Sequence, residues 1–524
     1  MKIFVRSFFK KLFKKLFKKS FSRLWILSLM SLSLLALVSS AQAARKKNTA
    51  RRTVIVPGLS DQGLSKSELA GRVRDRLDKL VTHAGLSSAS FGLWVGRSTE
   101  LGIETYYKHN ADQQFIPASL SKLVTLATVL HDLSPGFKFK TQLLSSADLK
   151  DGKLMGSIYL KGGGDPSFVS ENMWVLVNDL THAGVKEVMG DVIVDDTRFD
   201  SIRFGADRQK ERVDRAYDAP VGAMSMNWNA VNVYVRPGNA PGEKCHVSVD
   251  LTTPYIIVRN ETKTAGAGRG QTISVERETD SKSHAEVITV RGAMGVGVPE
   301  TVVYKSITSP DLFAGNNLVD FLQQRGIKVT GQVKTGVAPV DTKVIASVDG
   351  KPLAQVVADM AKFSNNFVAE MLTKNMASES GEHPATMASG LEHDHRYLES
   401  IGIPKGSYEF VNAAGFTRDN LLTPAQLGRL LETVHRDFTI YPEFLVALPI
   451  AGVDGTLHKR MQGSAAERWV RAKTGLLNGA VGLAGFAGRP HGEVISFAFI
   501  YNGGGNEEKA RSVFDRFAAA LAED

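Results

Sequence analysis

Cysteine is nearly absent from this chain of 524 residues, because Cys245 is its only one. A single thiol excludes an internal disulfide and a metal cluster held by cysteines. The fold must therefore be stabilised by a hydrophobic core, which a chain of this length can bury. With 43% hydrophobic and 23% charged residues, the composition is that of a globular protein, and the length suggests about three domains.

Two common active-site motifs are also missing. No GxSxG stretch is present, so the sequence lacks the nucleophile elbow of an α/β-hydrolase. The run Gly162-Gly163-Gly164-Asp165-Pro166 is not followed by the Lys-Ser/Thr pair of a phosphate-binding P-loop. Glycines permit backbone conformations that other residues avoid. We therefore predict a structural turn here in preference to a phosphate loop.

The formal charge of +10 comes mostly from the N-terminus. Residues 1–23 carry nine basic side chains and no acidic one, residues 24–38 are mostly apolar, and Ala41-Gln42-Ala43 follows. This order is typical of a secretory signal peptide, with cleavage near Ala43. The apolar stretch is short for a membrane span, which needs about 20 residues; an amphipathic surface helix is the alternative.

Without that leader the charge is nearly balanced. Removing its nine basic residues from the total of 64 leaves 55 against 54 acidic residues, a net charge of +1. The mature chain therefore gives no electrostatic reason to expect a nucleic-acid partner, and we predict peripheral membrane contact at most. Residues 44–67 are basic, then polar and Gly/Ser-rich, and are predicted to be a linker.

Hydrophobic periodicity predicts a mixed order of helices and strands. The expected helices are residues 66–83, a helix beginning near Ser119, 173–183, 311–324, one helix over 353–372, and 510–521. The expected strands are 90–95 paired with 103–107, then 141–144, 157–160, 188–194, six short strands between 230 and 305, and a hairpin of 482–488 with 494–501. His393-Asp394-His395 could be a metal pair, but its charged surroundings favour a solvated helix end.

Ser119-Leu120-Ser121-Lys122 opens an apolar run with helical spacing. Residues three apart lie on one helix face, so the Lys122 amine is placed to take the proton of the Ser119 hydroxyl. A serine is a weak nucleophile until such a base activates it. Alone, the pattern is better explained as a helix start with a serine near its cap and a surface lysine, so partner motifs have to decide.

The partners of an SxxK serine would be an SxN and a KTG motif, and each occurs more than once. Ser364-Asn365-Asn366 competes with Ser170-Glu171-Asn172 and Ser225-Met226-Asn227, and Lys473-Thr474-Gly475 competes with Lys334-Thr335-Gly336. Spacing does not decide, because Ser225 to Lys334 and Ser364 to Lys473 both span 109 residues. Context favours Ser364, inside the helical pattern 353–372, and Lys473, just before an apolar hairpin.

Ser119–Lys122, Ser364–Asn366 and Lys473–Gly475, in that order, resemble the class C low-molecular-mass penicillin-binding proteins, which are D-alanyl-D-alanine carboxypeptidases and DD-endopeptidases. The stretches GGGDP at 162–166, Ala219-Pro220 and AGVDGTL at 451–457 support the resemblance. So does the gap of 245 residues between Ser119 and Ser364, which is much shorter in serine β-lactamases.

The resemblance implies an α+β fold. A transpeptidase/β-lactamase-like domain with an antiparallel sheet flanked by helices would carry an inserted second domain, which itself holds an inserted β-rich module. The corresponding division is 1–43 signal peptide, 44–67 linker, 68–140 and 346–524 catalytic domain, 141–220 and 306–345 domain II, and 221–305 domain III.

Catalytic roles also follow from the resemblance. Ser119 would be acylated, with Lys122 as its general base; an ordinary lysine pKa is about 10.4, and the nearby charge of Lys473 would lower it. Ser364 would pass the proton to the leaving group, and Asn366 would bind the substrate amide.

The remaining roles concern substrate binding. The Lys473-Thr474-Gly475 motif would hold the terminal carboxylate, and the backbone N–H groups of Ser119 and Leu476 would form the oxyanion hole. Leu476 replaces the Ser or Thr that the family commonly has. Arg418, at the end of an altered DGSGLSR stretch, would meet an acidic substrate terminus. Arg212, Asp214 and Asp218 crowd the region where the family reads a diaminopimelate side chain, so the recognition residue stays open.

The implied activity is that of an exported, periplasmic serine peptidase that needs no metal or other cofactor. Its partners would be peptidoglycan stem peptides and cross-bridges, and β-lactam antibiotics would inhibit it by acylating Ser119. A serine β-lactamase and a non-catalytic peptidoglycan-binding scaffold are the alternatives. The oligomeric state, the balance of the two peptidase activities and the role of the β-rich module stay open.

Overall fold

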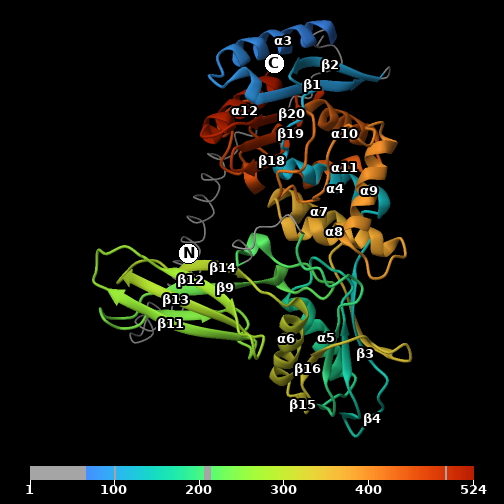
Figure 1. Ribbon diagram of the computed structural model, residues 1–524, viewed down its shortest axis with the longest axis vertical. Helices are drawn as coiled ribbons and strands as arrows, with labels where there is room; N and C mark the ends of the chain where they lie inside the picture. Colours follow the sequence, from blue (N-terminus) through green and yellow to red (C-terminus); the bar gives the residue numbers. More distant parts are fainter. Residues whose placement is uncertain (1–65, 100–101, 206–213, 490–491, 524) are drawn as a thin grey trace, which may run out of the picture. The chain divides into compact units, whose positions relative to one another are not determined.

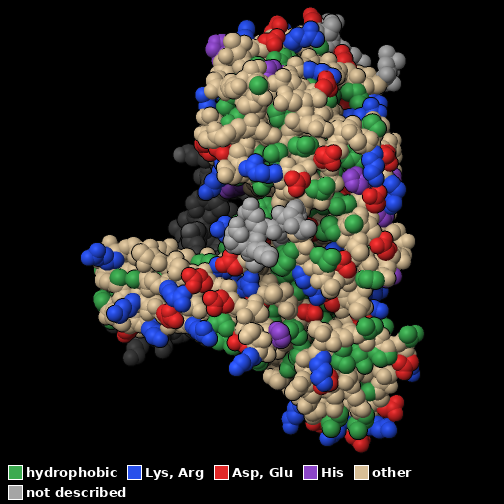
Figure 2. Space-filling view, viewed as in Figure 1, with side chains coloured by type: hydrophobic (Ala, Val, Ile, Leu, Met, Phe, Trp, Pro, Cys, Tyr) green, Lys and Arg blue, Asp and Glu red, His purple; other side chains and the backbone are tan. Residues whose placement is uncertain are grey.

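The computed structural model describes residues 66–99, 102–205, 214–489 and 492–523. The expected signal peptide 1–43 and the linker up to residue 65 lie outside the described residues, as does Arg212. Among the residues that the structure describes, no helix is long and apolar enough to cross a membrane. On the face shown in Figure 2, basic and acidic side chains are interspersed.

The first fold unit is a five-stranded antiparallel sheet made from both ends of the described chain (Figure 1). Its strands, in spatial order, are β18 (Val470–Leu477), β19 (Ala480–Gly488), β20 (Val494–Asn502), β1 (Phe91–Thr99) and β2 (Gly102–His109). β1 pairs with β20 over a long sequence distance, with Phe91 opposite Tyr501. In this order β18 is an edge strand. The predicted pairings of 90–95 with 103–107 and of 482–488 with 494–501 are confirmed.

Helices cover both faces of this sheet. Successive strand residues point to opposite faces, so Phe497 and Phe499 pack with α3 (Lys66–Thr82) and α12 (Glu507–Ala522), while Ala498 and Ile500 belong to the core on the other face. The helices that contribute to this second core are α4 (Lys122–Asp132), α7 (Leu353–Lys362), α8 (Asn366–Glu379), α9 (Met387–Ser400), α10 (Pro424–Arg436) and α11 (Tyr441–Ala447).

The inserted part begins and ends on a pair of antiparallel strands, β3 (Lys140–Ser145) and β17 (Lys343–Asp349). They belong to a five-stranded sheet with β6 (Ile158–Lys161), β8 (Val192–Asp195) and β16 (Val333–Thr335). A small sheet of β4 (Leu149–Lys150), β5 (Lys153–Leu154), β7 (Glu187–Val188) and β15 (Lys328–Val329) and the helices α5 (Ser170–His182) and α6 (Pro310–Gln324) complete this layer.

The β-rich segment within the insertion forms two three-stranded sheets. One contains β10 (His246–Val249), β9 (Ala230–Arg236) and β14 (Thr301–Ser306); the other contains β11 (Ile256–Ala265), β13 (Glu286–Gly295) and β12 (Ser274–Thr279). One hydrophobic core runs from β6 and α5 through β9 to β13, with Leu160, Leu176, Val233 and Val290 among its members. The predicted α+β class, with an antiparallel sheet flanked by helices and an inserted β-rich part, is confirmed.

Two predicted elements are wrong because each is broken in the middle. The single helix expected over 353–372 is two helices, α7 and α8, separated by Phe363, Ser364 and Asn365. The single strand expected over 188–194 is divided between β7 and β8, which lie in different sheets. At the second break, a Cβ on Gly190 would lie 2.6 Å from the Gly156 backbone, so the chain turns there in close contact with its neighbour.

The expected solvated helix end at His393–His395 is also wrong. These residues lie in the interior of α9, where Asp394 is completely buried. His393 Nδ1 lies 2.6 Å from Asp132 Oδ2 at the end of α4. The contact between His393 and Asp132 therefore connects α9 to α4 inside the protein. Among the described residues, no group of His, Cys, Asp and Glu has the arrangement of a metal site.

Candidate active site

Ser119 lies in a short 3-10 turn, η2 (Ala118–Ser121), that leads directly into α4. The turn is closely surrounded: a Cβ on Gly475 would lie 2.7 Å from Pro117 O, and a Cβ on Gly415 would lie 1.9 Å from Ala118 O. Ala118 has a positive φ of 50°, a conformation that L-residues adopt at a cost. The glycines let β18 and the 412–415 segment hold this strained turn in place.

Lys122 follows one turn later and is almost completely buried. Its Nζ lies 3.1 Å from Ser119 Oγ, and donates to Asn366 Oδ1 at 2.7 Å and to Ala414 O at 2.6 Å. A buried amine needs such partners to offset the loss of hydration. These contacts fix the direction of Nζ toward the hydroxyl of Ser119.

Ser364 occupies the break between α7 and α8 rather than a helix interior. Its φ is +55°, and the Asn365 side chain accepts a hydrogen bond from Val368 N at 3.2 Å as the cap of α8. The break turns Ser364 toward β18, where its Oγ accepts a hydrogen bond of 2.7 Å from Lys473 Nζ. Asn366, the first residue of α8, faces Lys122 and also donates to Tyr217 O at 3.2 Å.

Lys473 lies in β18 and has no exposed surface. Burial, together with repulsion from the Lys122 charge, holds the pKa of Lys473 well below its ordinary value. The sequence predicted that Lys473 lowers the pKa of Lys122; the structure shows the repulsion between the two lysines at Lys473, and the shift of Lys122 stays a prediction. Lys122 contacts Ser119 and Asn366, and Lys473 contacts Ser364. Because the charges of the two lysines also interact, the five residues form one cluster.

Among the described residues, one edge of β18 has no neighbouring strand in the sheet. Ala472 N donates away from β19 to Pro449 O at 3.0 Å, and because strand N–H groups alternate in direction, those of Thr474 and Leu476 are on the same free edge. Leu476 is 53% exposed. Arg418 is exposed near the β18–β19 turn, where its side chain donates to Asn478 O.

The serine or lysine of each competing motif is engaged in other contacts. Ser170 is the first residue of α5, Ser225 is buried and donates to Gly222 O at 2.6 Å, and Lys334 in β16 is paired with Asp191. Ser364 and Lys473 contact one another in the cluster that contains Ser119, as the context of the motifs led us to expect. The context used for Ser364 was a helix interior, however, and Ser364 lies between two helices.

Sequence reasoning missed two contributors to the cluster. One is the carbonyl of Ala414, which contacts Lys122; Gly415, with φ +66° and no room for a Cβ, is the signal that this segment lies against the Ser119 turn. The other is Thr456, whose Oγ1 accepts from Thr474 Oγ1 at 2.9 Å. The sequence feature that could have indicated Thr456 is the AGVDGTL stretch, in which Asp454 Oδ2 accepts a hydrogen bond of 2.7 Å from Lys362 Nζ.

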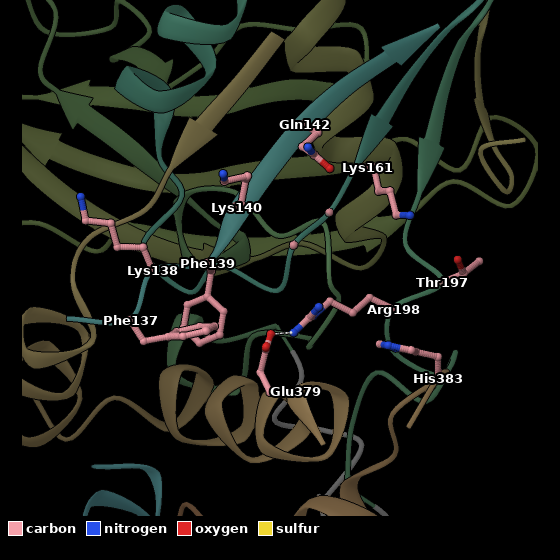
Figure 3. A pocket seen from close by; sticks show the side chains of 12 residues that line it. Phe137, Lys138, Phe139, Lys140, Gln142, Lys161, Thr197, Arg198, Glu379 and His383 are labelled. Atoms are coloured by element: carbon pink, nitrogen blue, oxygen red, sulfur yellow. Dashed lines mark hydrogen bonds and ion pairs between the residues drawn. The ribbon is translucent and has the colours of Figure 1, made fainter. Parts of the chain in front are cut away.

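The GGGDP stretch lies at a different cavity, of about 460 Å³ (Figure 3). There Arg198 and Glu379 point toward one another and form an ion pair, and Lys140 and Lys161 project from neighbouring strands. A Cβ on Gly163 would lie 1.9 Å from Lys140 O, and Asn375 donates to Gly164 O at 2.7 Å. Close packing therefore accounts for these glycines.

Known proteins resemble this chain in fold and, more distantly, in sequence. Penicillin binding protein 4 of Haemophilus influenzae superposes with a TM-score of 0.72 at 24% identity, over 85% of this chain and 98% of that one. Its complex with a β-lactam gives 0.68 at 23% identity, over the same shares of both chains. At these identities the likeness shows the fold alone, and it confirms a transpeptidase-like fold with inserted domains.

Sequence comparison gives the family. The D-alanyl-D-alanine carboxypeptidase of Actinomadura sp. is 30% identical over 483 residues, which are 89% of this chain and 87% of that protein. Residues 73–523 match the D-Ala-D-Ala carboxypeptidase 3 (S13) family. The chain belongs to this family of serine-type carboxypeptidases, and the resemblance to low-molecular-mass penicillin-binding proteins is confirmed.

Proposed function

We propose that the protein is a serine D-Ala-D-Ala carboxypeptidase that also cleaves D-alanyl cross-bridges as a DD-endopeptidase. Its substrates would be the stem peptides of peptidoglycan. The observation that carries the proposal is the 3.1 Å approach of Lys122 Nζ to Ser119 Oγ inside a cluster that contains a second Lys–Ser pair. A nucleophile within hydrogen-bond reach of a buried base is the arrangement that covalent catalysis requires.

The surroundings of Lys122 suit a base. A neutral amine has two N–H donors and one lone pair, and the carbonyl oxygens of Ala414 and the Asn366 side chain can accept the two donors. The third direction leads to Ser119, so the lone pair can take the hydroxyl proton as Ser119 Oγ attacks the peptide carbonyl. The bond from Ser119 oxygen to the carbonyl carbon forms, and the tetrahedral intermediate carries the negative charge.

Two groups would then complete acylation. The backbone N–H groups of Ser119 and Leu476 would bind the oxyanion, a contribution typically worth about 10²–10³ in rate. Ser364 would donate a proton to the leaving nitrogen as the C–N bond breaks, and it would be reprotonated through Lys473 and Lys122. Water, activated by Lys122, would hydrolyse the acyl-enzyme. A β-lactam amide would acylate Ser119 by the same first step.

The remaining assignments concern substrate orientation. Lys473, Thr474 and Gly475 would hold the terminal carboxylate of the substrate, and Arg418 would meet an acidic substrate terminus. The position of β18 at the edge of its sheet supports this reading, because an extended peptide can pair with the backbone N–H groups of an edge strand. No group in this scheme requires a metal or another cofactor.

We further propose that the chain is exported to the periplasm after cleavage near Ala43, and that domain II comprises 141–220 and 306–345 around domain III at 221–305. The pairing of β3 with β17 supports an insertion that starts and ends at one place. The basic and apolar N-terminal pattern supports export.

Replacing Ser119 with alanine tests the proposed function. The Ser119→Ala protein is expected to release no D-alanine from a pentapeptide ending in D-Ala-D-Ala and to take up no labelled penicillin. Lys334→Met, in the competing KTG motif, serves as the control and should leave both activities unchanged. Labelling of Ser119→Ala at the level of the parent protein would overturn the proposal.

A further inference from the structure

The cavity shown in Figure 3 concentrates positive charge. Four basic side chains line it, those of Lys138, Lys140, Lys161 and Arg198, whereas Glu379 is the single acidic residue among the described residues of its lining. Beyond the predicted leader, basic and acidic residues are nearly equal in number. A general excess of basic residues therefore does not explain the charge of this cavity.

The strand register places two of the lysines on one face of the sheet. Lys161 in β6 lies opposite Gln142 in β3, and Lys140 is two residues from Gln142, so the three side chains point the same way. Diagonal neighbours of this kind are about 7–8 Å apart, close enough for their like charges to repel. Lys140 Nζ lies 3.6 Å from Asp349 Oδ1, whereas Lys161 has no ion pair within the described residues.

Arg198 faces the same cavity and is fixed by its neighbours. Its Nε donates to Asn375 Oδ1 at 3.2 Å, and its Nη2 pairs with Glu379. Asn375 is completely buried in α8 and donates to Gly164 O at 2.7 Å. A guanidinium has five N–H donors, and these two contacts set its plane while using two of them. The cavity thus combines one preorganised cation with flexible lysines.

The size and the remaining lining indicate the kind of ligand. A cavity of about 460 Å³ is in the range of small-molecule sites. Phe137, which is half-buried and in edge contact with Phe139, adds an apolar wall beside the cations. In Figure 3, Arg198 and His383 lie below Lys140 and Lys161 in the view. Cationic side chains therefore reach the cavity from separate segments of the chain.

This arrangement suits a phosphate group better than a carboxylate. A carboxylate is a planar monoanion, which a single arginine can bind through two parallel hydrogen bonds. A phosphate monoester carries about two negative charges and three strong acceptor oxygens, so it can accept from several cations that approach from different directions. Lysine binds phosphate as a point charge, and arginine adds directed N–H donors.

We propose that this cavity binds a phosphate group carried by an organic ligand. Lys140 and Lys161 would neutralise the phosphate, Arg198 would orient it, and Phe137 would contact the apolar part of the ligand. The glycines of the GGGDP stretch shape the floor of the cavity by close packing and are not the phosphate ligands themselves. A phosphorylated saccharide and the headgroup of an anionic phospholipid both carry this chemistry.

The proposed phosphate site is separate from the Ser119 cluster. Helix α8 begins at Asn366, beside Lys122, and ends 14 residues later at Glu379 in the cavity lining. At a rise of 1.5 Å per residue its two ends are about 20 Å apart. The inference therefore does not rest on the proposed peptidase function.

Binding to the full-length protein tests the inference. Isothermal titration calorimetry would use inorganic phosphate and glucose 1-phosphate, and cosedimentation would use phosphatidylcholine vesicles with and without phosphatidylglycerol. We expect a phosphate probe to bind, and Lys161→Gln to raise its Kd by about tenfold or more, the typical effect of losing one charge-assisted hydrogen bond. Lys161→Arg, which keeps the charge, should bind nearly as tightly as the parent. Binding of glucose 1-phosphate would indicate a soluble ligand, and binding only to vesicles with phosphatidylglycerol would indicate a lipid headgroup.

A matched control separates this cavity from unspecific attraction to lysines. Lys334 lies in β16 of the same sheet, is exposed and does not line the cavity, so Lys334→Gln should leave the Kd unchanged. Penicillin labelling of Lys161→Gln should equal that of the parent, which shows that the variant is folded. Ser119→Ala should bind the phosphate probe as the parent does, and added salt should weaken binding in both.

Three results would overturn the inference: no binding of any phosphate probe at millimolar concentration, a Lys161→Gln protein that binds as tightly as the parent, or succinate, a dicarboxylate, binding as tightly as the phosphate probes. None of them would bear on the peptidase activity. Conversely, a protein that binds phosphate but takes up no penicillin would contradict the proposed function and leave this inference intact.

Discussion

At Lys473 the requirements of catalysis and of folding oppose each other. The side chain is fully buried beside a second lysine, and both burial and repulsion from Lys122 depress its pKa. A neutral apolar residue of similar length would avoid both costs, whereas the proposed mechanism needs the amine next to Ser364. Active-site residues of this kind commonly reduce the stability of the protein that carries them.

Lys473→Met should therefore be inactive and more stable. We expect acylation by labelled penicillin to slow by at least about 10²-fold, and unfolding at pH 7 to require about 1–3 kcal/mol more. Because the folded-state pKa is depressed, the parent regains stability as pH rises toward about 10.4. The advantage of the variant should thus shrink with increasing pH in urea titrations. Lys334→Met, at an exposed ion pair, should show neither effect.

Asp394 is a second buried ionisable residue, outside the active site. Burial, reinforced by the charge of Asp132, raises the pKa of Asp394 to about 8. The nearby Thr128 hydroxyl lowers the pKa of Asp394 only in part, because it donates its hydrogen bond to Val124 O. Within the described residues, neither carboxylate oxygen of Asp394 accepts a hydrogen bond. The folded protein therefore holds a proton on Asp394 at pH values where the unfolded chain has lost it.

Asp394→Asn should remove this dependence on pH. A folded-state pKa above the unfolded value makes the parent lose stability as pH rises from about 4 toward about 8, while an amide does not titrate. The variant should gain at least about 1 kcal/mol relative to the parent between pH 5 and pH 8, measured from urea midpoints at both values. Parallel pH profiles of the two proteins would contradict the prediction.

Much of the site could be predicted at the level of single residues. The three motifs carry Ser119, Lys122 and Lys473 in a fixed order, and the proposed reaction needs those side chains, which few others can replace. Asp394 could not be predicted, since a charged stretch is ordinarily solvent-exposed. Its burial depends on the packing of α9 against α4, which no local pattern records.

At the scale of elements, the decisive feature is the break between α7 and α8. Phe363 and Phe367 continue the helical spacing across it, so periodicity alone predicts one helix. The positive φ of Ser364 ends α7 and lets Asn365 begin α8 as its cap. Serine is not a residue that ordinarily favours this conformation, and the sequence therefore gives no signal of the break.

Two substitutions of Ser364 separate the backbone effect from the chemical one. Both Ser364→Gly and Ser364→Ala lack the hydroxyl and should acylate slowly. Glycine adopts positive φ without strain, so Ser364→Gly should be about 1 kcal/mol more stable than Ser364→Ala. Equal urea midpoints for the two variants would show that the break does not impose this conformation in solution.

At the scale of the whole molecule, the two inserted layers share one core although they differ in architecture. Glu286 in β13 joins them: it is fully buried, and accepts from Tyr255 Oη at 3.0 Å and from Arg277 at 3.1 Å. It also accepts from Thr308 N, just before α6. The β-rich segment was predictable from its short strands and turn residues, but this shared core was not, because its contacts join distant parts of the sequence.

Glu286→Ala should therefore weaken the whole insertion at once. Removing one partner of a buried ion pair costs about 3–5 kcal/mol, and a continuous core transmits that loss as a cooperative unit. Hydrogen exchange should accelerate together in β13, β9 and α6, while β19 and β20 keep their protection. Faster exchange confined to β11, β12 and β13 would show that the two layers unfold independently.

The pairing of β1 with β20 also bears on when the proposed active site can form during folding. Ser119 and Lys122 are synthesised early, whereas Lys473 and the strand next to β1 come near the end of the chain. Contacts so distant in sequence form late in folding. A growing or incompletely folded chain would carry the nucleophile for hundreds of residues without the partners that activate it. Cleavage of the proposed peptidoglycan substrate would thus be delayed until the chain has folded.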